Sequence, residues 1–329
     1  MICDYKDCGG CKYKELSFDD YQKKISQNRE QVFFAPFCSR RRVNFSFVGK
    51  KFGFYQAKSH NIIDVEKCNA VCFDIKKIKE FVLMLGYKEG EAFITKAANG
   101  LALKVVAKAE ITLDNKLDLA DFLNANDDII SIAINDYEVK KAEPYINICG
   151  VKVFINPDSF LQATQESEAK MVELCSQYLK DTNGKILDLF CGLGTFSYSL
   201  CGNIKNKITS IDSNDIALDL FKKTVNANQI ANIDIKTQNL IKYPLTAEEL
   251  ETFDAIVFDP PYKGALNQVK EICKCNKMFK KIVAISCNEE SFNVDKKELE
   301  NKGYKLTELT YVDQFLYSDH IELVALFEG

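Results

Sequence analysis

The chain has 329 residues, a formal net charge of −4 and an isoelectric point near 5.5. Hydrophobic residues make up 47% and charged residues 27% of it, which is ordinary for a globular protein with room for two cores. The acidic balance argues against a protein coated in positive charge for nonspecific nucleic-acid binding. No apolar run approaches the roughly 20 residues that span a bilayer, and no basic-then-apolar leader opens the chain. We therefore expect a cytoplasmic protein without a membrane anchor.

Cysteines are the first notable feature along the chain. Their number is 13, so a disulfide framework would leave at least one thiol over, and thiols kept for metal or catalysis fit better. Cys3, Cys8 and Cys11 show a C-x4-C-x2-C spacing, and Cys68 follows at a distance. Four thiolates can hold zinc or an iron-sulfur cluster, and the spacing alone does not choose between them.

All the arginines lie between residues 29 and 42, and three are consecutive: Arg40, Arg41 and Arg42. Such a run is often only a solvated charged face. It can also form a phosphate-binding strip, because the forked donors of arginine suit phosphate better than the point charge of lysine. Both interpretations stay open at this point.

Residues 1–150 alternate polar and apolar positions in the manner of half-buried antiparallel strands. The expected strands are 41–48, 52–57, 100–113 and 128–135, with a helix near 73–86. Aromatic residues that alternate along the first strands are usually core on one face, so we expect at most a few to stack on bases. This pattern predicts a small α+β domain over residues 1–150.

A helix from about Gln165 to Lys180 joins this part to the rest of the chain. Short apolar runs then alternate with helical stretches to the C-terminus. The runs are 185–190, 207–212, 233–237, 253–261 and 281–287. This order predicts parallel strands joined by crossover helices, and hence a doubly wound, Rossmann-like α/β domain over residues 151–329.

The strand-to-helix turns of this domain suggest a nucleotide site. Asp188 ends the first strand, and Gly192 and Gly194 follow in a turn where the backbone can approach a ligand. Asp212 ends the next strand, where an acid can bind a ribose diol, and Asn239 follows the third as a contact for adenine. The turn lacks a Gly-Lys-Ser/Thr phosphate cradle, and its acid would repel a pyrophosphate. A ligand with an amine and no phosphate fits best, as S-adenosylmethionine does.

Reactive groups meet at the same sheet edge. The fourth strand ends in residues 259–262, Asp-Pro-Pro-Tyr, which alone resembles methyltransferases acting on exocyclic amines of adenine or cytosine. The next strand delivers Cys287, and Glu322 precedes the last strand. A thiolate that adds to carbon 6 of uracil makes carbon 5 nucleophilic, and a base must then remove the hydrogen at carbon 5. A lone cysteine at a strand end is more often a core residue. The interpretation of Cys287 as a nucleophile therefore depends on its position at the same sheet edge as Glu322.

Five motifs resemble, in order and spacing, the 5-methyluridine RNA methyltransferases, the family of RumA, RumB and TrmA. They are "FINPDSFLQATQ" (154–165), "ILDLFCGLGTF" (186–196), "FDPPYKGA" (258–265), "SCN" (286–288) and "HIE" (320–322). The resemblance implies that Cys287 is the nucleophile and Glu322 the base. It also implies that Gln162 and Asp259 help to hold cofactor or uracil.

The sequence departs from the family pattern at Thr164, Tyr262 and Leu316. In the family, asparagine, arginine and proline are usual at these positions. The departures put fine substrate contacts in doubt, and Tyr262 keeps an amino-methyltransferase open as an alternative. A further alternative is a noncatalytic iron-sulfur protein that binds RNA.

The Cys-Gly-Gly-Cys turn, with its distant fourth cysteine, resembles the [4Fe-4S] site of the ribosomal RNA branch. The resemblance implies a cluster on Cys3, Cys8, Cys11 and Cys68, and it favours ribosomal RNA over transfer RNA as substrate. Residues 40–55 are similar to a family segment that contacts RNA, which supports a role for Arg40, Arg41 and Arg42. The additional N-terminal barrel of RumA has no counterpart in this sequence, so we expect residues 1–150 to recognise the RNA. The family expectation is a monomer.

Overall fold

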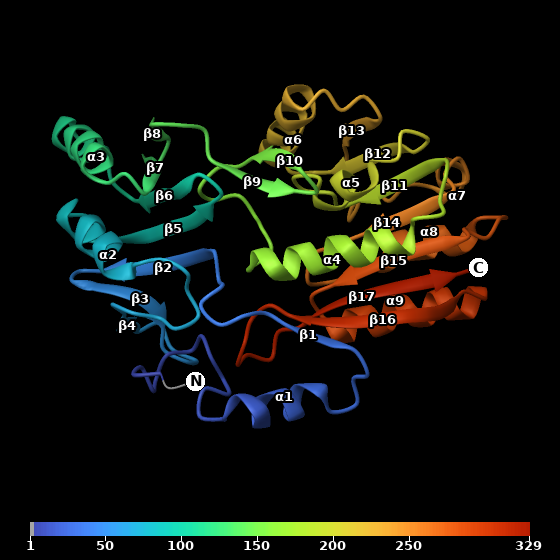
Figure 1. Ribbon diagram of the computed structural model, residues 1–329, viewed down its shortest axis with the longest axis horizontal. Helices are drawn as coiled ribbons and strands as arrows, with labels where there is room; N and C mark the ends of the chain where they lie inside the picture. The colour runs from blue at the N-terminus through green and yellow to red at the C-terminus, as the bar shows by residue number, and fades with distance from the viewer. Residues whose placement is uncertain (1–2) are drawn as a thin grey trace.

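Two large β-sheets lie side by side in the computed structural model, which describes residues 3–329 (Figure 1). We call them the N-terminal sheet, at the left of Figure 1, and the C-terminal sheet, at the right. A hairpin of β9 (Tyr145–Ile148) and β10 (Val151–Phe154) lies between them in the chain. No helix within residues 3–329 is long and apolar enough to cross a membrane.

The N-terminal sheet is antiparallel except where β6 and β7 pair. In spatial order its strands are β4 (Ile62–Asp64), β3 (Lys51–Tyr55), β2 (Arg42–Val48), β5 (Glu89–Ala97), β6 (Gly100–Ala107), β7 (Ile129–Ile134) and β8 (Tyr137–Lys140). Helices α2 (Ile75–Met84) and α3 (Leu113–Ala125) pack on it, with Phe81 and Leu119 in its core. The predicted α+β character of this part agrees with the structure.

Local sequence explains where the strand predictions succeed and fail. In β2 the alternating Val43, Phe45 and Phe47 are all buried, as the pattern predicts. The strand expected over 100–113 is too long, because β6 ends at Ala107. Thr112 instead caps α3: its hydroxyl accepts from the backbone N–H of Asn115, whose side chain accepts from the N–H of Thr112. This capping box outweighs the apolar residues around it.

The C-terminal sheet is parallel except for β17, which is antiparallel to both neighbours. In spatial order its strands are β1 (Val32–Phe34), β16 (Lys305–Asp313), β17 (Glu322–Glu328), β15 (Lys281–Ser286), β14 (Ala255–Phe258), β11 (Lys185–Leu189), β12 (Lys207–Asp212) and β13 (Ile233–Thr237). This order agrees with the predicted doubly wound, Rossmann-like α/β domain.

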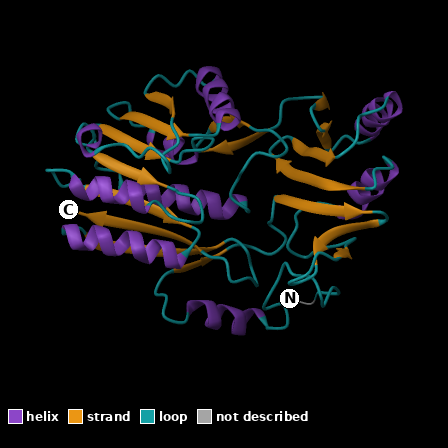
Figure 2. Cartoon of the chain, turned by 180° about the vertical axis from the view of Figure 1, so that it is seen from behind, coloured by secondary structure: helices purple, strands orange, loops and turns teal. Residues whose placement is uncertain are grey.

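Helices cover both faces of the C-terminal sheet (Figure 2). They are α1 (Phe18–Ser26), α4 (Gln165–Tyr178), α5 (Thr195–Leu200), α6 (Asp215–Ala227), α7 (Ala247–Leu250), α8 (Leu266–Lys274) and α9 (Glu289–Lys302). Met171 of α4 and Phe196 of α5 share one core with the sheet. Val269 of α8 and Phe292 of α9 belong to another. Each helix therefore buries one apolar face against the strands.

The division expected at residue 150 stays a prediction, and the N-terminal segment reaches across it. β1 pairs in parallel with β16, with Val32 opposite Tyr311. In α1, the ring of Tyr21 stacks on Tyr317 with centroids 4.5 Å apart, and its hydroxyl donates to Asp313 Oδ2 at 2.6 Å. Residues before β2 thus help to build the C-terminal part. The sequence did not predict this, because β1 is too short to show a strand pattern.

Candidate active site

A cavity of about 670 Å³ opens at the carboxyl ends of the parallel strands of the C-terminal sheet. Doubly wound sheets bind ligands at this edge. The cavity brings together most of the residues singled out from the sequence: Gln162, Gly192, Asp212, Asn239, Asp259, Cys287 and Glu322. It is large enough for a small-molecule cofactor and a single base.

Strand pairing sets the positions of Cys287 and Glu322. β15 ends at Ser286 and β17 begins at Glu322, and the two strands are antiparallel neighbours. Ser286 lies opposite Leu323, so Cys287 and Glu322 occupy the next positions outward along the two strands. The backbone register therefore delivers a thiol and a carboxyl group to the same cavity.

Cys287 lies between a strand end and a helix start. Asn288 caps α9 by accepting from the backbone N–H of Glu290, and its amide donates to the backbone oxygen of Tyr262 at 3.1 Å. Burial raises the pKa of the Cys287 thiol to about 11, and the neighbouring Glu322 and Asp259 carboxyls add to this effect. In the free chain the thiol is therefore protonated near neutral pH.

Glu322 is buried and belongs to a hydrogen-bond network. Gln314 Nε2 donates to Glu322 Oε1 at 2.8 Å and to Gln162 Oε1 at 2.9 Å. Burial raises the pKa of Glu322 to about 7, while the hydrogen bond from Gln314 lowers it. The carboxyl group can therefore exist in either protonation state near neutral pH, as a general base requires. Sequence reasoning missed Gln314, because only the pairing of β16 with β17 places it here.

Asp259 follows β14 and lines the same cavity. Removal from water raises the pKa of Asp259 well above its usual range, and the Glu322 and Asp188 carboxyls act in the same direction. Neighbouring carboxyl groups disfavour one another's ionised forms. Asp259 and Glu322 therefore retain protons at pH values where an isolated carboxyl group would lose them.

Gly192 and Asp212 form the wall expected for a cofactor. Gly192 has a φ of +52°, and a Cβ added there would meet no atom within 4 Å, so the backbone faces open space. Its N–H donates to Asp212 Oδ2 at 2.9 Å. Asp212 Oδ1 accepts from the N–H groups of Ser213 and Asn214. The carboxylate is thus fixed at the cavity by its own turn.

Two predicted cofactor contacts, Asp188 and Gly194, are buried and are not among the described residues that line the cavity. Asp188 Oδ2 accepts from the hydroxyl of Ser197 at 2.5 Å, and burial raises the pKa of Asp188 to about 7. Gly194 has a φ of +89°, and a side chain there would collide with the ring of Phe221. Asp188 and Gly194 support the segment that joins β11 to α5 from its buried side. In that segment, Gly192 is the glycine that lines the cavity.

The predicted thiol ligands share one neighbourhood. Burial raises the pKa of Cys11 to about 11, and the nearby thiols of Cys68, Cys8 and Cys3 raise it further. Across residues 3–329, however, no three His, Cys, Asp or Glu side chains gather closely enough to hold a metal ion. The donor set is present in this region, and its side chains are not arranged as metal ligands.

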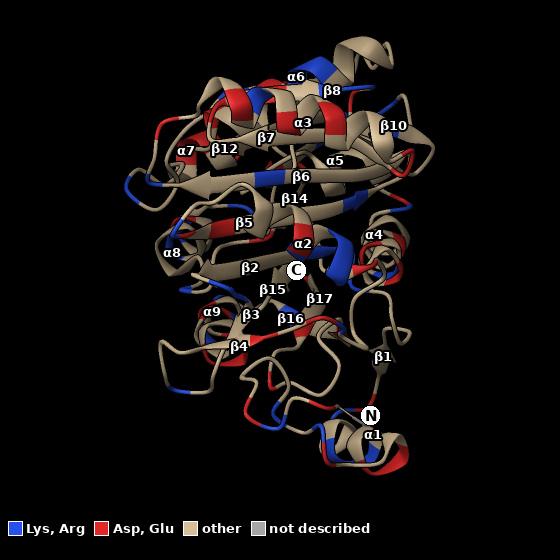
Figure 3. Ribbon diagram, turned by 90° about the vertical axis from the view of Figure 1, so that its left-hand side faces the viewer, with Lys and Arg blue, Asp and Glu red and all other residues tan. Residues whose placement is uncertain are grey.

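Arg41, the middle residue of the predicted arginine strip, is buried. Its side chain is 4% exposed and forms a 2.5 Å ion pair with Glu168, itself 3% exposed. Arg41 Nε also donates to the backbone oxygen of Gln162, so it supports that loop from within. Arg40 and Arg42 lie over the rings of Phe315 and Phe160, respectively. Acidic and basic residues mix along the elements seen in Figure 3.

The comparisons with known proteins agree with this geometry. The family model described as tRNA (Uracil-5-)-methyltransferase matches residues 146–328. The chain belongs to this family. An uncharacterized RNA methyltransferase of Agrobacterium fabrum is 30% identical over 98% of this chain and 82% of that protein. The 23S rRNA (uracil(1939)-C(5))-methyltransferase RlmD of Aliivibrio fischeri is 26% identical over 99% of this chain and 82% of its own.

A solved structure shares the fold. The tRNA (uracil-54, C5)-methyltransferase of Pyrococcus abyssi, in complex with S-adenosyl-L-homocysteine, superposes with a TM-score of 0.79 at 21% identity. The match covers 99% of this chain and 88% of that one. Nearly the whole chain, including the N-terminal sheet, therefore shares the fold of that structure.

One of the three departures from the family pattern has a local explanation. Thr164 caps α4 by accepting from the N–H of Ser167 at 3.1 Å, a role that asparagine also fills. Tyr262 is 61% exposed at the cavity, where its backbone oxygen accepts from Asn288. Leu316 lines a separate small cavity beside Gln314. Nothing in the structure explains why leucine replaces proline there.

Proposed function

We propose that this S-adenosylmethionine-dependent RNA uracil-5 methyltransferase modifies a uridine of ribosomal RNA. In this proposal Cys287 adds to carbon 6 of uracil and Glu322 removes the proton from carbon 5. The observation that carries the proposal is that both side chains line the cavity that Gly192 and Asp212 also line. A methyltransferase that acts on exocyclic amines has no use for such a thiol and carboxyl pair.

S-adenosylmethionine, when bound, would supply the methyl group as an electrophilic sulfonium. Asp212 would accept hydrogen bonds from the ribose diol, and Asn239 would face the adenine. Gly192 leaves the open space that the ligand needs beside the turn. Gln162 and Asp259 would hold the uracil or the methionine end. These assignments rest on the cavity lining and on the family pattern.

The chain's own residues account for the remaining chemistry. The Cys287 thiol loses its proton to water and forms a bond from sulfur to carbon 6, which makes carbon 5 nucleophilic. After carbon 5 has gained its methyl group, Glu322 takes the proton from that carbon. The electrons of the broken C–H bond form the C5–C6 double bond, and the C–S bond breaks to release the Cys287 thiolate. The target uridine has to leave its stack to enter the cavity.

Ribosomal RNA is the proposed substrate for two reasons. The RlmD relative, whose printed activity is on 23S rRNA, aligns with 99% of the chain. The four N-terminal cysteines resemble the site of the ribosomal branch. Transfer RNA is the second candidate, because the family description and the Pyrococcus abyssi enzyme both name it. An enzyme that modifies either RNA would work in the cytoplasm, and we expect a monomer.

We further propose that Cys3, Cys8, Cys11 and Cys68 hold a [4Fe-4S] cluster. The support is the chemistry of the donor set, since thiolates suit such clusters, and the mutual influence of these thiols on the pKa of Cys11. Methyl transfer involves no oxidation or reduction, so the cluster would have a structural role. It would join the N-terminal loop to the segment that follows β4. Residues 1–150, with Arg40 and Arg42, would then present a firm surface to RNA.

Nucleoside analysis tests the proposed function. The purified protein is incubated with S-adenosylmethionine and unmodified ribosomal or transfer RNA transcripts, and the digested RNA is analysed for methylated nucleosides. We expect 5-methyluridine in ribosomal RNA. Formation of 5-methyluridine only in transfer RNA would move the substrate to the second candidate. A methylated adenosine or cytidine amine would instead support the alternative that the Asp-Pro-Pro-Tyr motif raises.

A further inference from the structure

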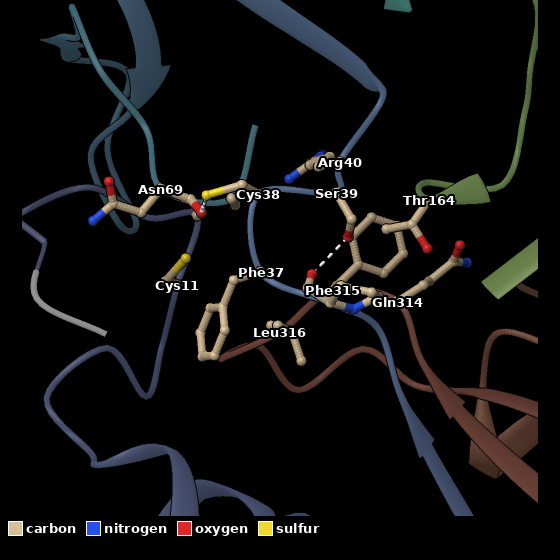
Figure 4. Close-up of a pocket in the computed structure, with 13 residues that line it drawn as sticks. Cys11, Phe37, Cys38, Ser39, Arg40, Asn69, Thr164, Gln314, Phe315 and Leu316 are labelled. Atoms are coloured by element: carbon tan, nitrogen blue, oxygen red, sulfur yellow. Dashed lines mark hydrogen bonds between the residues drawn. The ribbon is translucent and has the colours of Figure 1, made fainter. Parts of the chain in front are cut away.

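Gln314 occupies an unusual position beside the active site. It is 4% exposed and follows β16 directly. Among the described residues, those that line the large cavity do not include it, whereas it does line a small neighbouring cavity. Figure 4 shows Gln314 on the same side of that small cavity as Thr164, with Cys11 on the other side. A ligand in the active site would therefore meet the partners of Gln314 and not Gln314 itself.

The orientation of the Gln314 amide follows from its contacts. The backbone N–H of Ala163 donates to Gln314 Oε1 at 2.7 Å, and only an oxygen can accept that bond. The amide nitrogen must then face the other way, where it donates to Glu322 and Gln162. Each of these partners lines the large cavity. One amide thus fixes both the proposed base and a proposed ligand-holding amide.

The segment that carries Gln314 is itself held on both sides. Asp313 accepts from the hydroxyl of Tyr21 and, through its backbone oxygen, from the N–H of Ala35 at 3.0 Å. The ring of Phe315 lies under the guanidinium of Arg40, 5.3 Å from it. These contacts come from the N-terminal segment. Gln314 has little freedom to turn, which suits a residue whose task is to orient others.

We propose that Gln314 is a positioning residue for the proton-removal step, an inference that rests on the proposed role of Glu322 as the base. Its hydrogen bond orients the Glu322 carboxylate toward the cavity and favours the ionised form, which is the form able to take a proton. Its second hydrogen bond occupies the oxygen of Gln162 and turns the nitrogen end of that amide toward a ligand. Loss of Gln314 should therefore slow the release of the covalent intermediate more than its formation.

The test uses Gln314→Met, which keeps the size of the side chain and removes its amide. The matched control is Gln268→Met, because Gln268 is also buried and, among residues 3–329, its amide bonds to the backbone of Leu245 alone. Each protein is incubated with ordinary uridine-containing RNA and S-adenosylmethionine. The reaction is stopped with denaturant, and the methylated protein–RNA adduct is quantified by denaturing electrophoresis beside the turnover rate. Gln314→Glu, which still accepts from Ala163, serves if the methionine variant fails to fold.

We expect Gln314→Met to lower kcat by at least about tenfold and to raise the fraction of enzyme held as methylated adduct. The rising limb of its pH–kcat profile should move to higher pH, because the hydrogen bond that keeps the pKa of Glu322 down is lost. Gln268→Met should leave the adduct fraction and the pH limb as in the wild type. A slower Gln314→Met with an unchanged adduct fraction and pH limb would overturn the proposal. Failure of the wild type itself to form an adduct with 5-fluorouridine RNA would instead refute the covalent mechanism.

Discussion

The active-site cavity and the N-terminal thiol group show two ways to bring distant residues together. Cys287 and Glu322 lie next to the ends of paired strands, so backbone hydrogen bonds fix their places without a ligand. Cys11 and Cys68 lie on irregular segments, and the Cys68 thiol raises the pKa of Cys11. Among residues 3–329, however, no group of cysteines is close enough to hold a metal ion. Sheet pairing can prepare a site in advance, whereas a site on loops takes its final form from the ion or cluster that it binds.

Removal of the nucleophile should have the largest effect on the prepared site. Cys287→Ala is expected to lower 5-methyluridine formation by at least about 10⁴-fold, because carbon 5 is then never activated. Tritiated methyl transfer to RNA measures the rate, and calorimetry should show unchanged binding of S-adenosylmethionine. Cys273→Ala is the matched control, since that thiol is also half-buried and lies outside the cavity. Full activity of Cys287→Ala would favour the amino-methyltransferase.

Loss of the base should block a later step. Glu322→Gln is expected to lower turnover by about 10²- to 10⁴-fold while the methylated adduct still forms. In the wild type, only the ionised carboxylate takes the proton, and burial raises the pKa of Glu322 to about 7. The kcat should therefore rise with pH through about 7. A wild-type profile that is flat from pH 6 to 8, or a Glu322→Gln variant that forms no adduct, would assign the base elsewhere.

Asp212→Asn should weaken the cofactor and leave the chemistry intact. Loss of charge-assisted hydrogen bonds to the ribose corresponds to roughly 10- to 100-fold weaker binding of S-adenosylmethionine. Calorimetry with the cofactor alone gives this value without RNA. Asp234→Asn, on the exposed neighbouring strand β13, provides the control. Equal affinities for the two variants would remove Asp212 from the cofactor site.

Substitution of a proposed cluster ligand should have the smallest effect on the methylation rate and the largest effect on the metal content. Cys68→Ser, after anaerobic incubation with iron and sulfide, is expected to lose most of the iron that the wild type retains. Cys72→Ser changes an exposed cysteine outside the predicted ligand set and should keep it. Iron and acid-labile sulfide analysis measures the difference. Equal iron contents in the wild type and both variants would contradict the cluster and leave the loop without its proposed tie.

Sequence reasoning worked best where a residue ends a strand. Asp212, Asp259 and Cys287 each follow an apolar run, and parallel strands present their carboxyl ends at one edge. The alternation of strands and helices was enough to place these side chains in one cavity. The expectation that the aromatics of β2 belong to the core was also correct for Phe45 and Phe47.

The sequence was less informative where pairing partners or depth decide a role. Gln314 is close to Glu322 only because β16 and β17 are antiparallel, which no local pattern reveals. Asp212 ends β12, whereas Asp188 lies one residue before the end of β11 and is fully buried. Arg41 belongs to a charged run, but its side chain is buried in an ion pair with Glu168. Composition and spacing describe which groups are present, and burial decides which of them meet a ligand.

Covalent trapping tests the central claim most directly. The protein is incubated with ribosomal RNA containing 5-fluorouridine and with S-adenosylmethionine, and is then separated by denaturing electrophoresis beside Cys287→Ala. Fluorine at carbon 5 cannot leave as a proton, so Glu322 cannot complete the reaction and the thioether should persist. The account predicts a cofactor-dependent, RNA-linked band for the wild type and none for Cys287→Ala. A band of equal intensity in both proteins, or none with ribosomal or transfer RNA, would contradict it.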